Sequence, residues 1–200
     1  MRRAAGPSSL RAAEIRSALD AGEIVAHYQP IVSLNTGEVV ALEALARWQH
    51  PRHGLLGPCD FVPMAEETGL VTRLDRTILE QACRAAASLP GIAPAVHVNV
   101  SGAGLATREL LVAVEGALEE TGLAENTVVM VIADHGEMLG ERDLWYKMTF
   151  FENAVRIPFI VHNPKRFAPR RVSQSVSLVD VLPTLVELAS GEDRKPQAIS

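Results

Sequence analysis

Cysteine and aromatic residues are scarce in this chain, and long apolar runs are missing altogether. Only two of the 200 residues are cysteines, Cys59 and Cys83. They are too few for a disulfide framework, which suits a reducing compartment. No run approaches the roughly 20 apolar residues of a membrane span, and residues 1–23 contain no apolar segment typical of a secretory signal. We therefore expect a cytoplasmic protein that does not bind membranes.

The chain also lacks an excess of basic residues. Lys and Arg number 19 against 24 Asp and Glu, which gives a formal net charge of −5. Nucleic acids and anionic membranes attract basic surfaces, so neither DNA nor RNA is an expected partner. Hydrophobic residues make up 48% of the chain, enough to bury a core as one or two domains.

The apolar residues recur in a way that predicts strands alternating with helices. Two strand-like runs, 24–34 and 39–48, are joined by a short polar turn with glycine and predict a hairpin. The helices expected from apolar spacing and end signals cover residues 10–21, 60–69 (with Asp60 as N-cap), 74–88, 110–122 and part of 177–189. Further strands are expected at 95–100, 127–133 and 157–161. Such alternation indicates α/β architecture with a mainly parallel sheet, in which 127–133 would be fully buried.

Glu43 and Arg47 stand in an otherwise apolar strand. Because they are four residues apart, their side chains point to the same side of that strand. Buried there, the two charges would need partners, and a metal ion with a phosphate group would supply them. A simple ion pair at a strand end is the alternative for a lone Glu/Arg pair.

The segments around this pair form a specific pattern. They are His27-Tyr28-Gln29-Pro30-Ile31, Glu43-Ala44-Leu45, Asp60-Phe61-Val62-Pro63, Ala65-Glu66-Glu67-Thr68-Gly69 and Val98-Asn99-Val100-Ser101. Together they resemble the EAL domain, the cyclic-di-GMP phosphodiesterase family, over about residues 10–122. The resemblance implies a modified TIM barrel in which two divalent ions activate water against a phosphodiester. By this resemblance Glu43 and Asn99 would bind Mg²⁺ or Mn²⁺, Gln29 would contact the nucleotide, and Arg47 the phosphate.

The resemblance ends part-way through the barrel. By comparison with that family, the strand after residue 125 should carry a glutamate ligand in a pattern like Glu-x-Thr-Glu, and Val131 stands there instead. The paired aspartates, the lysine and the last glutamate of the family lie on later strands and have no counterpart. About half of the barrel is therefore expected.

A second pattern begins near Asn126. Its segments are Asp134-His135-Gly136-Glu137-Met138-Leu139-Gly140-Glu141, Leu144-Trp145-Tyr146-Lys147-Met148, Phe150-Phe151-Glu152, Arg156-Ile157-Pro158, Arg166-Phe167-Ala168-Pro169-Arg170-Arg171 and Ser177-Leu178-Val179-Asp180. They resemble the sulfatases, choline sulfatase most closely, up to about Ala189. The resemblance implies an alkaline-phosphatase-like α/β fold. Asp134 and His135 would then bind Ca²⁺, Mg²⁺ or Mn²⁺, and Lys147 would contact the sulfate.

Two observations limit the sulfatase comparison. For a bare Asp-His-Gly, an aspartate helix cap beside a hydrogen-bonded histidine is the common alternative. A sulfatase also needs a formylglycine made from Cys or Ser in a Cys/Ser-x-Pro/Ala-x-Arg motif, and neither Cys59 nor Cys83 lies in one. Without that nucleophile, the remaining residues would at most bind an ion or an anion.

The two resemblances predict a chimera with its seam near residues 115–126. Its expected parts are a flexible tail (1–9), a partial TIM-barrel-like EAL half (10–122), a sulfatase-like strand–helix segment (123–190) and a frayed tail (191–200). We expect no turnover from this hybrid, with retained binding of a metal ion or of a phosphate or sulfate anion.

Two other functions remain open. One is an EAL-type phosphodiesterase or a module that binds a cyclic dinucleotide, and the other is a choline-sulfatase-like sulfuric ester hydrolase. The expected ligands are a cyclic dinucleotide or a small phosphate or sulfate ester. Half a barrel would also leave strand edges uncovered, which predicts self-association through those edges.

Overall fold

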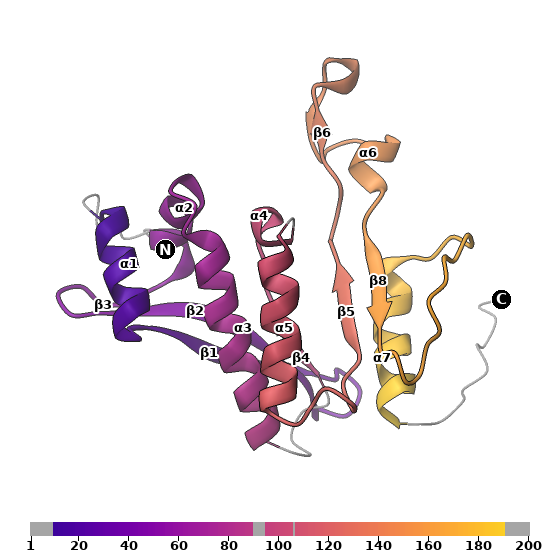
Figure 1. Cartoon of the computed structure of the whole chain (residues 1–200). Helices are drawn as coiled ribbons and strands as arrows, with labels where there is room; N and C mark the ends of the chain where they lie inside the picture. Colours follow the sequence, from indigo (N-terminus) through magenta and orange to yellow (C-terminus); the bar gives the residue numbers. More distant parts are fainter. Residues whose placement is uncertain (1–9, 90–94, 106, 191–200) are drawn as a thin grey trace. The chain divides into compact units, whose positions relative to one another are not determined.

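The computed structural model describes residues 10–89, 95–105 and 107–190 (Figure 1). The chain divides into two compact units, unit 1 (Met1–Ala124) and unit 2 (Glu125–Ser200). The tails expected at 1–9 and 191–200 lie outside the described residues. Within the described ranges, none of the helices has the length and apolarity needed to cross a membrane.

Unit 1 contains a four-stranded sheet centred on its longest strand. Its strands are β1 (Ile24–Val32), β2 (Val39–His50), β3 (Gly54–Leu56) and β4 (Val96–Val98). β2 pairs with β1 and β3 in antiparallel register and with β4 in parallel register. The predicted hairpin is confirmed by β1 and β2, and Gly37 in its turn adopts the positive φ of 72° that favours glycine.

The longer helices of unit 1 lie close to their predicted positions, whereas the short helix Gly102–Leu105 was not predicted. They are α1 (Ala12–Ala21), α2 (Pro58–Glu67), α3 (Val71–Ser88), α4 (Gly102–Leu105) and α5 (Arg108–Glu120). The prediction of Asp60 as an N-cap is wrong, because α2 begins two residues earlier and Gly57 is its N-cap. Asp60 instead accepts a hydrogen bond from the backbone N–H of Gly57 at 3.0 Å. A carboxylate in the first helical turn can satisfy such a donor just as well.

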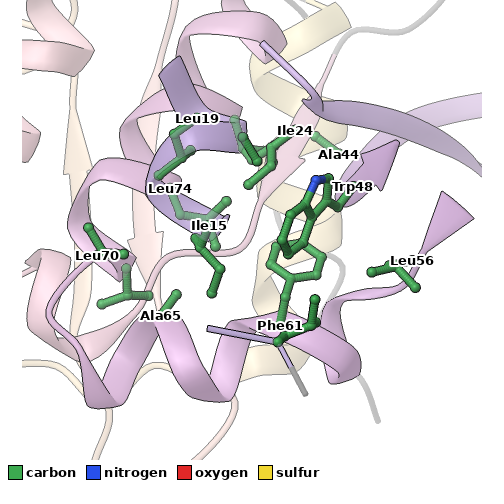
Figure 2. Packing of buried hydrophobic residues seen from close by; sticks show 14 of the residues in the cluster. Ile15, Leu19, Ile24, Ala44, Trp48, Leu56, Phe61, Ala65, Leu70 and Leu74 are labelled. Atoms are coloured by element: carbon green, nitrogen blue, oxygen red, sulfur yellow. The ribbon is translucent and has the colours of Figure 1, made fainter. Parts of the chain in front are cut away.

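One face of the sheet carries the apolar core of unit 1. Alternate residues of a strand point to opposite faces, so one face presents Ile24, Ala26, Tyr28, Ala44, Ala46, Trp48, Val96 and Val98. The helices α1, α2 and α3 pack on this face through Ile15, Phe61 and Leu74, which are almost fully buried. Figure 2 shows Trp48 and Phe61 in contact at the centre of this cluster, with their rings nearly perpendicular.

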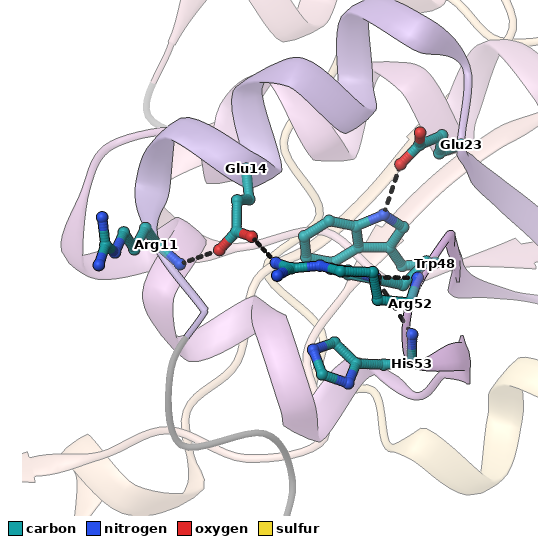
Figure 3. A network of polar contacts seen from close by, with 7 residues as sticks. Arg11, Glu14, Glu23, Trp48, Arg52 and His53 are labelled. Carbon is teal, nitrogen blue, oxygen red and sulfur yellow. Dashed lines mark hydrogen bonds and ion pairs between the residues drawn. The ribbon is translucent and has the colours of Figure 1, made fainter.

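A polar network fixes α1 to the end of β2. Glu14 accepts from the backbone N–H of Arg11 at 3.0 Å and from the guanidinium of Arg52 at 2.5 Å (Figure 3). In the same network, Trp48 donates from Nε1 to Glu23 at 3.0 Å. The buried indole therefore keeps a partner for its one polar atom, as large amphipathic rings in cores usually do.

The outer edge of β1 is covered in part by a helix side chain. Gln81 of α3 accepts from the backbone N–H of Ala26 at 2.9 Å and donates to the carbonyl of Ile24 at 3.1 Å. These are the backbone groups that an edge strand leaves unpaired. At this point of β1, the edge is therefore less available for self-association than the sequence predicted.

Unit 2 consists of short elements. They are β5 (Val129–Ile132), β6 (Met138–Leu139), the 3₁₀ turn Glu141–Asp143, β7 (Trp145–Tyr146), α6 (Glu152–Val155), β8 (Phe159–His162), the 3₁₀ turn Leu178–Asp180 and α7 (Val181–Ser190). β5 pairs with β8 and β6 pairs with β7, both antiparallel. The strands and the C-terminal helix predicted in this region are thus confirmed in position.

Two predictions about the strands are wrong. Residues Val129–Val131 are only half-buried and Ile132 is exposed, so β5 is not fully buried. The sheets are also not mainly parallel, since β2–β4 is the single parallel pairing in the described parts of the chain. Short turns join β1 to β2 and β2 to β3, and such connections give antiparallel pairs, whereas a parallel pair needs a crossover like α3.

Candidate functional site

The face of the unit 1 sheet opposite the core carries polar side chains. The strands β1, β2 and β4 present there His27, Gln29, Glu43, Arg47 and His97, which we call the polar face. Gln29 lies directly opposite Glu43 in the β1–β2 register, and His97 lies opposite Glu43 on the other side. Directly opposite residues share a face with Cβ atoms about 5 Å apart, so Glu43 is central to this group.

The closest polar contact at this face joins two predicted metal ligands. Asn99, which follows the end of β4, donates from Nδ2 to Oε1 of Glu43 at 2.9 Å. Rotating the amide by half a turn would place its oxygen at the same position. Both residues would then present oxygen to one cation, which is the donor type preferred by Mg²⁺ and Mn²⁺. The pair fits part of a divalent-ion site.

Two donors are fewer than a tightly held divalent ion requires. Among the residues that the structure describes, no group of three or more His, Cys, Asp or Glu side chains is placed to hold a metal ion. The remaining coordination positions would be open to water or to phosphate oxygens, which is common for Mg²⁺. Val131, where the family comparison expects a further ligand, lies in β5 of unit 2 opposite Ile160.

Arg47 is not the ion-pair partner of Glu43. Its Nη1 donates to the backbone carbonyl of Ala46 at 2.8 Å, and no ion pair joins it to Glu43 in the described part of the chain. The simple ion pair considered from the sequence is therefore not formed. A half-buried guanidinium with free donors on the same face as Glu43 is suited to bidentate binding of phosphate.

The sequence analysis missed a buried carboxylate that bonds to Ser101, two residues after Asn99. Asp75 of α3 is 6% exposed and accepts from both the backbone N–H and the hydroxyl of Ser101, at 3.0 and 2.6 Å. Burial raises the pKa of the Asp75 carboxyl, and the bonds from Ser101 oppose that rise. The signal was present in the sequence as an aspartate within the buried stripe of α3, beside Leu74 and Ile78.

The three predicted sulfatase-like residues also lie together, at the end of β5. Nδ1 of His135 is 2.6 Å from the carbonyl of Gly136, which makes that nitrogen the donor. Nε2 is then the acceptor, and it lies 2.8 Å from Nζ of Lys147 and 3.3 Å from Asp134. The ammonium of Lys147 thus donates a hydrogen bond to the Nε2 lone pair, which a metal ion would need. In this arrangement the group does not fit a metal.

The site of His135 depends on a close approach of two backbone segments. Gly136 donates from its N–H to the carbonyl of Ala154 at 2.8 Å. A Cβ at position 136 would come within 2.0 Å of the carbonyl oxygen of Asn153, so only glycine fits there. No helix starts at this point of the chain, and Asp134 accepts from the N–H of His135 itself. The helix-cap alternative is therefore not realised.

The environment of Cys83 does not activate its thiol as a nucleophile. Cys83 is half-buried and packs beside Leu79 and Leu110, where α3 meets α5. Burial raises the pKa of its thiol, with a smaller opposing effect from Arg84. The reactive form is the thiolate, so this environment disfavours nucleophilic chemistry. Cys59 is exposed in the first turn of α2.

Unit 1 is a mixed α/β unit whose sheet has a polar face opposite its core, and comparison with known proteins shows its family. The EAL domain family model matches residues 12–148, and the chain belongs to this family. A sulfatase family model also matches, over residues 106–191. The two matches overlap over 106–148, so they do not divide at the seam expected from the sequence.

Similar proteins include cyclic di-GMP phosphodiesterases. The phosphodiesterase NbdA of Pseudomonas aeruginosa is 44% identical over 114 residues, which are 56% of this chain and 15% of that protein. PdeR of Escherichia coli, also named a cyclic di-GMP phosphodiesterase, is 41% identical over 108 residues, 53% of this chain and 16% of PdeR. This chain therefore spans only a small part of these relatives.

A solved structure of a phosphodiesterase also matches this chain. The phosphodiesterase PaMucR in complex with c-di-GMP matches with a TM-score of 0.51 and 35% sequence identity. The match covers 56% of this chain and 47% of that one. The EAL-domain structural neighbours and the strands and helices of unit 1 thus agree on a mixed α/β fold. The matched share is also consistent with part of an EAL domain.

Proposed function

We propose that this chain binds a cyclic dinucleotide at the polar face, with a divalent ion held by Glu43 and Asn99, and that it does not hydrolyse the ligand. The observation that carries the proposal is the 2.9 Å contact between these two side chains, directly beside Gln29 in the sheet register. The relatives named as cyclic di-GMP phosphodiesterases support the ligand class.

Each residue of the proposed site has a distinct role. Glu43 and Asn99 would hold Mg²⁺ or Mn²⁺ through their side-chain oxygens. Arg47 would offset the remaining phosphate charge through its guanidinium. Gln29 has both donor and acceptor groups and can recognise a nucleotide edge. When bound, the ion would stabilise the negative charge of the phosphate, and these side chains would orient the ligand.

The absence of turnover in this proposal rests on the missing carboxylates. Catalysis by two metal ions requires ligands for a second ion about 4 Å from the first ion, and Val131 cannot supply one. We propose that unit 1 is a partial TIM-barrel-like half and that the segment from about residue 123 derives from a sulfatase. The sulfatase family match supports that origin, and the proposed seam lies close to the boundary between the two compact units.

Calorimetry with cyclic-di-GMP in the presence of Mg²⁺ tests the binding. We expect saturable heat with the unchanged chain and at least a tenfold loss of affinity in Glu43→Ala, because removing a ligand should cost no less than removing an outer-shell partner, about 10–100-fold. Glu38→Ala is the matched control, since Glu38 is an exposed carboxylate in the turn of the same hairpin. No heat at high micromolar ligand would refute the proposal.

A product assay separates binding from hydrolysis. Cyclic-di-GMP incubated with the chain and Mg²⁺ or Mn²⁺ should remain intact. Linear dinucleotide formed by the unchanged chain but not by Glu43→Ala would show that the chain is a phosphodiesterase, and the proposed lack of turnover would then be wrong.

Hydrolysis of sulfate or phosphate esters by unit 2 is the second candidate. The clustering of Asp134, His135 and Lys147 favours it, but residues 106–191 contain no Cys/Ser-x-Pro/Ala-x-Arg motif for a formylglycine. Aryl sulfate and aryl phosphate hydrolysis should therefore be equal in the unchanged chain and in Asp134→Ala. A rate that depends on Asp134 would support this function instead.

A further inference from the structure

The buried carboxylate of Asp75 lies outside the polar face. A short loop connects it to Asn99, one of the two proposed metal ligands. Asp75 lies on α3, and its Oδ2 accepts two hydrogen bonds from Ser101, one from the backbone and one from the hydroxyl. Ser101 is two residues after Asn99. Asn99 in turn contacts Glu43. This connection runs from the buried side of α3 to the centre of the proposed site.

The hydroxyl of Ser101 makes two hydrogen bonds, one as donor and one as acceptor. Its hydroxyl donates to Asp75 at 2.6 Å and accepts from the backbone N–H of Gly104 at 2.9 Å. The space beside the carboxylate is closed as well, because a Cβ at position 104 would come within 2.5 Å of Oδ2 of Asp75. The backbone of the loop after β4 is thus fixed by polar bonds and by contact with the buried Asp75 of α3.

We propose that Asp75 is a positioning residue for the divalent-ion site: by fixing Ser101, it holds the loop after β4 so that the Asn99 amide faces Glu43. This inference rests on the proposed function for the role of the ion, but the positioning itself concerns the metal-free chain. A ligand that is already oriented loses less conformational freedom when the ion binds. Outer-shell partners of ligands commonly change metal affinity by about 10–100-fold.

A buried charge is a costly way to hold a loop, which argues against a purely incidental contact. Desolvation disfavours the ionised carboxyl, and this is the largest effect on the Asp75 pKa. Two donors from one residue offset that cost. A neutral acceptor at the same position would keep both bonds without the charge, which gives a variant that separates position from electrostatics.

The test uses the full chain with Asp75→Ala, Asp75→Asn and Ser101→Ala. The control is Thr77→Ala, which removes a hydroxyl of α3 that donates to the backbone carbonyl of Arg73 in the same helix. Mn²⁺ affinity is measured by electron paramagnetic resonance, and the Asn99 side-chain amide and Ser101 backbone amide are followed by NMR in the absence of metal. Asp75→Asn and Ser101→Ala keep the test valid if Asp75→Ala does not fold.

If Asp75 positions the loop, Asp75→Ala and Ser101→Ala should weaken Mn²⁺ binding by about 10–100-fold. In both variants, the NMR signals of the Asn99 side-chain amide and the Ser101 backbone amide should shift toward those of an unstructured loop. Asp75→Asn and Thr77→Ala should stay close to the unchanged chain. Equal losses in Asp75→Asn and Asp75→Ala would mean that charge, not position, matters, and would overturn the inference, as would unchanged NMR signals in Asp75→Ala. Shifted signals in a chain that binds no Mn²⁺ would uphold the positioning and refute the proposed function.

Discussion

The two units of this chain use similar proportions of apolar residues with different results. In unit 1, Ile15, Trp48 and Phe61 are buried between the sheet and three helices. In unit 2, the buried residues among those described are Met138, Ala154 and Asn163, while Trp145, Phe150 and other large side chains are exposed. Apolar side chains stabilise a fold only where a second layer covers them, and unit 2 has little such covering.

The difference extends to the polar groups. Glu43 and Asn99 meet on the polar face of a sheet whose other face is packed, and the buried Asp75 bonds to Ser101, two residues after Asn99. The group around His135 is held by contacts with Gly136 and Lys147 and by the backbone bond from Gly136 to Ala154, all between loop or short-element residues. Rigid supporting elements position functional groups more accurately than loops do. Unit 1 is therefore the better place for a specific ligand site.

The two tryptophans allow the sharpest test of this contrast. Trp48→Ala removes a side chain that is 1% exposed and should lower the free energy of unfolding of unit 1 by about 3–5 kcal/mol. Trp145→Ala, at a residue that is 63% exposed, should change stability by no more than about 0.5 kcal/mol. Urea unfolding followed by far-ultraviolet circular dichroism measures both. Equal losses would show that unit 2 has a core comparable to that of unit 1.

Two glycine substitutions should have opposite signs. Gly136→Ala places a methyl group against the Asn153 carbonyl and should destabilise unit 2 by about 1–3 kcal/mol. Gly116→Ala lies inside α5 with nothing near its added methyl group and should stabilise unit 1 by roughly 0.5–1 kcal/mol. Thermal unfolding and amide exchange of the pair provide the measurement. A neutral Gly136→Ala would mean that the backbone contact at Ala154 is not maintained in solution.

A smaller effect is expected in the pH dependence of stability. The pKa of Asp75 is raised above its ordinary value of 3.8 in the folded chain, so the folded state binds this proton more readily than the unfolded state does. The free energy of unfolding should therefore fall as pH rises from the unfolded pKa to the folded one. Asp75→Asn removes this component, so its stability relative to the unchanged chain should increase across that window and stay constant above it.

Urea unfolding at several pH values measures this component. Trp48 fluorescence in a Trp145→Phe background restricts the signal to unit 1, which contains Asp75. The opposite slope, with Asp75→Asn gaining stability as pH falls, would show that the folded state favours the ionised carboxyl. The bonds from Ser101 would then outweigh the burial.

Much of unit 1 could be predicted from local sequence. The glycine-containing turn and alternating runs define the β1–β2 hairpin, and the same alternation places Gln29, Glu43 and Arg47 on one face. The bond between Asp75 and Ser101 could not be predicted, because 26 residues separate the partners and their meeting depends on how α3 packs. In unit 2, the apolar composition of β5 is typical of a strand that is buried on both faces. Nothing in the neighbouring sequence indicates that, among the described strands, β8 alone pairs with β5.

Mn²⁺ titration of the unchanged chain, Glu43→Ala and Asp134→Ala tests the central claim most directly. Both substitutions remove one carboxylate, but only the first lies on the polar face of unit 1. If that face holds the ion, Glu43→Ala will lose at least tenfold in affinity and Asp134→Ala will bind like the unchanged chain. Loss of binding in Asp134→Ala with normal binding in Glu43→Ala would place the site at the end of β5 and contradict the account.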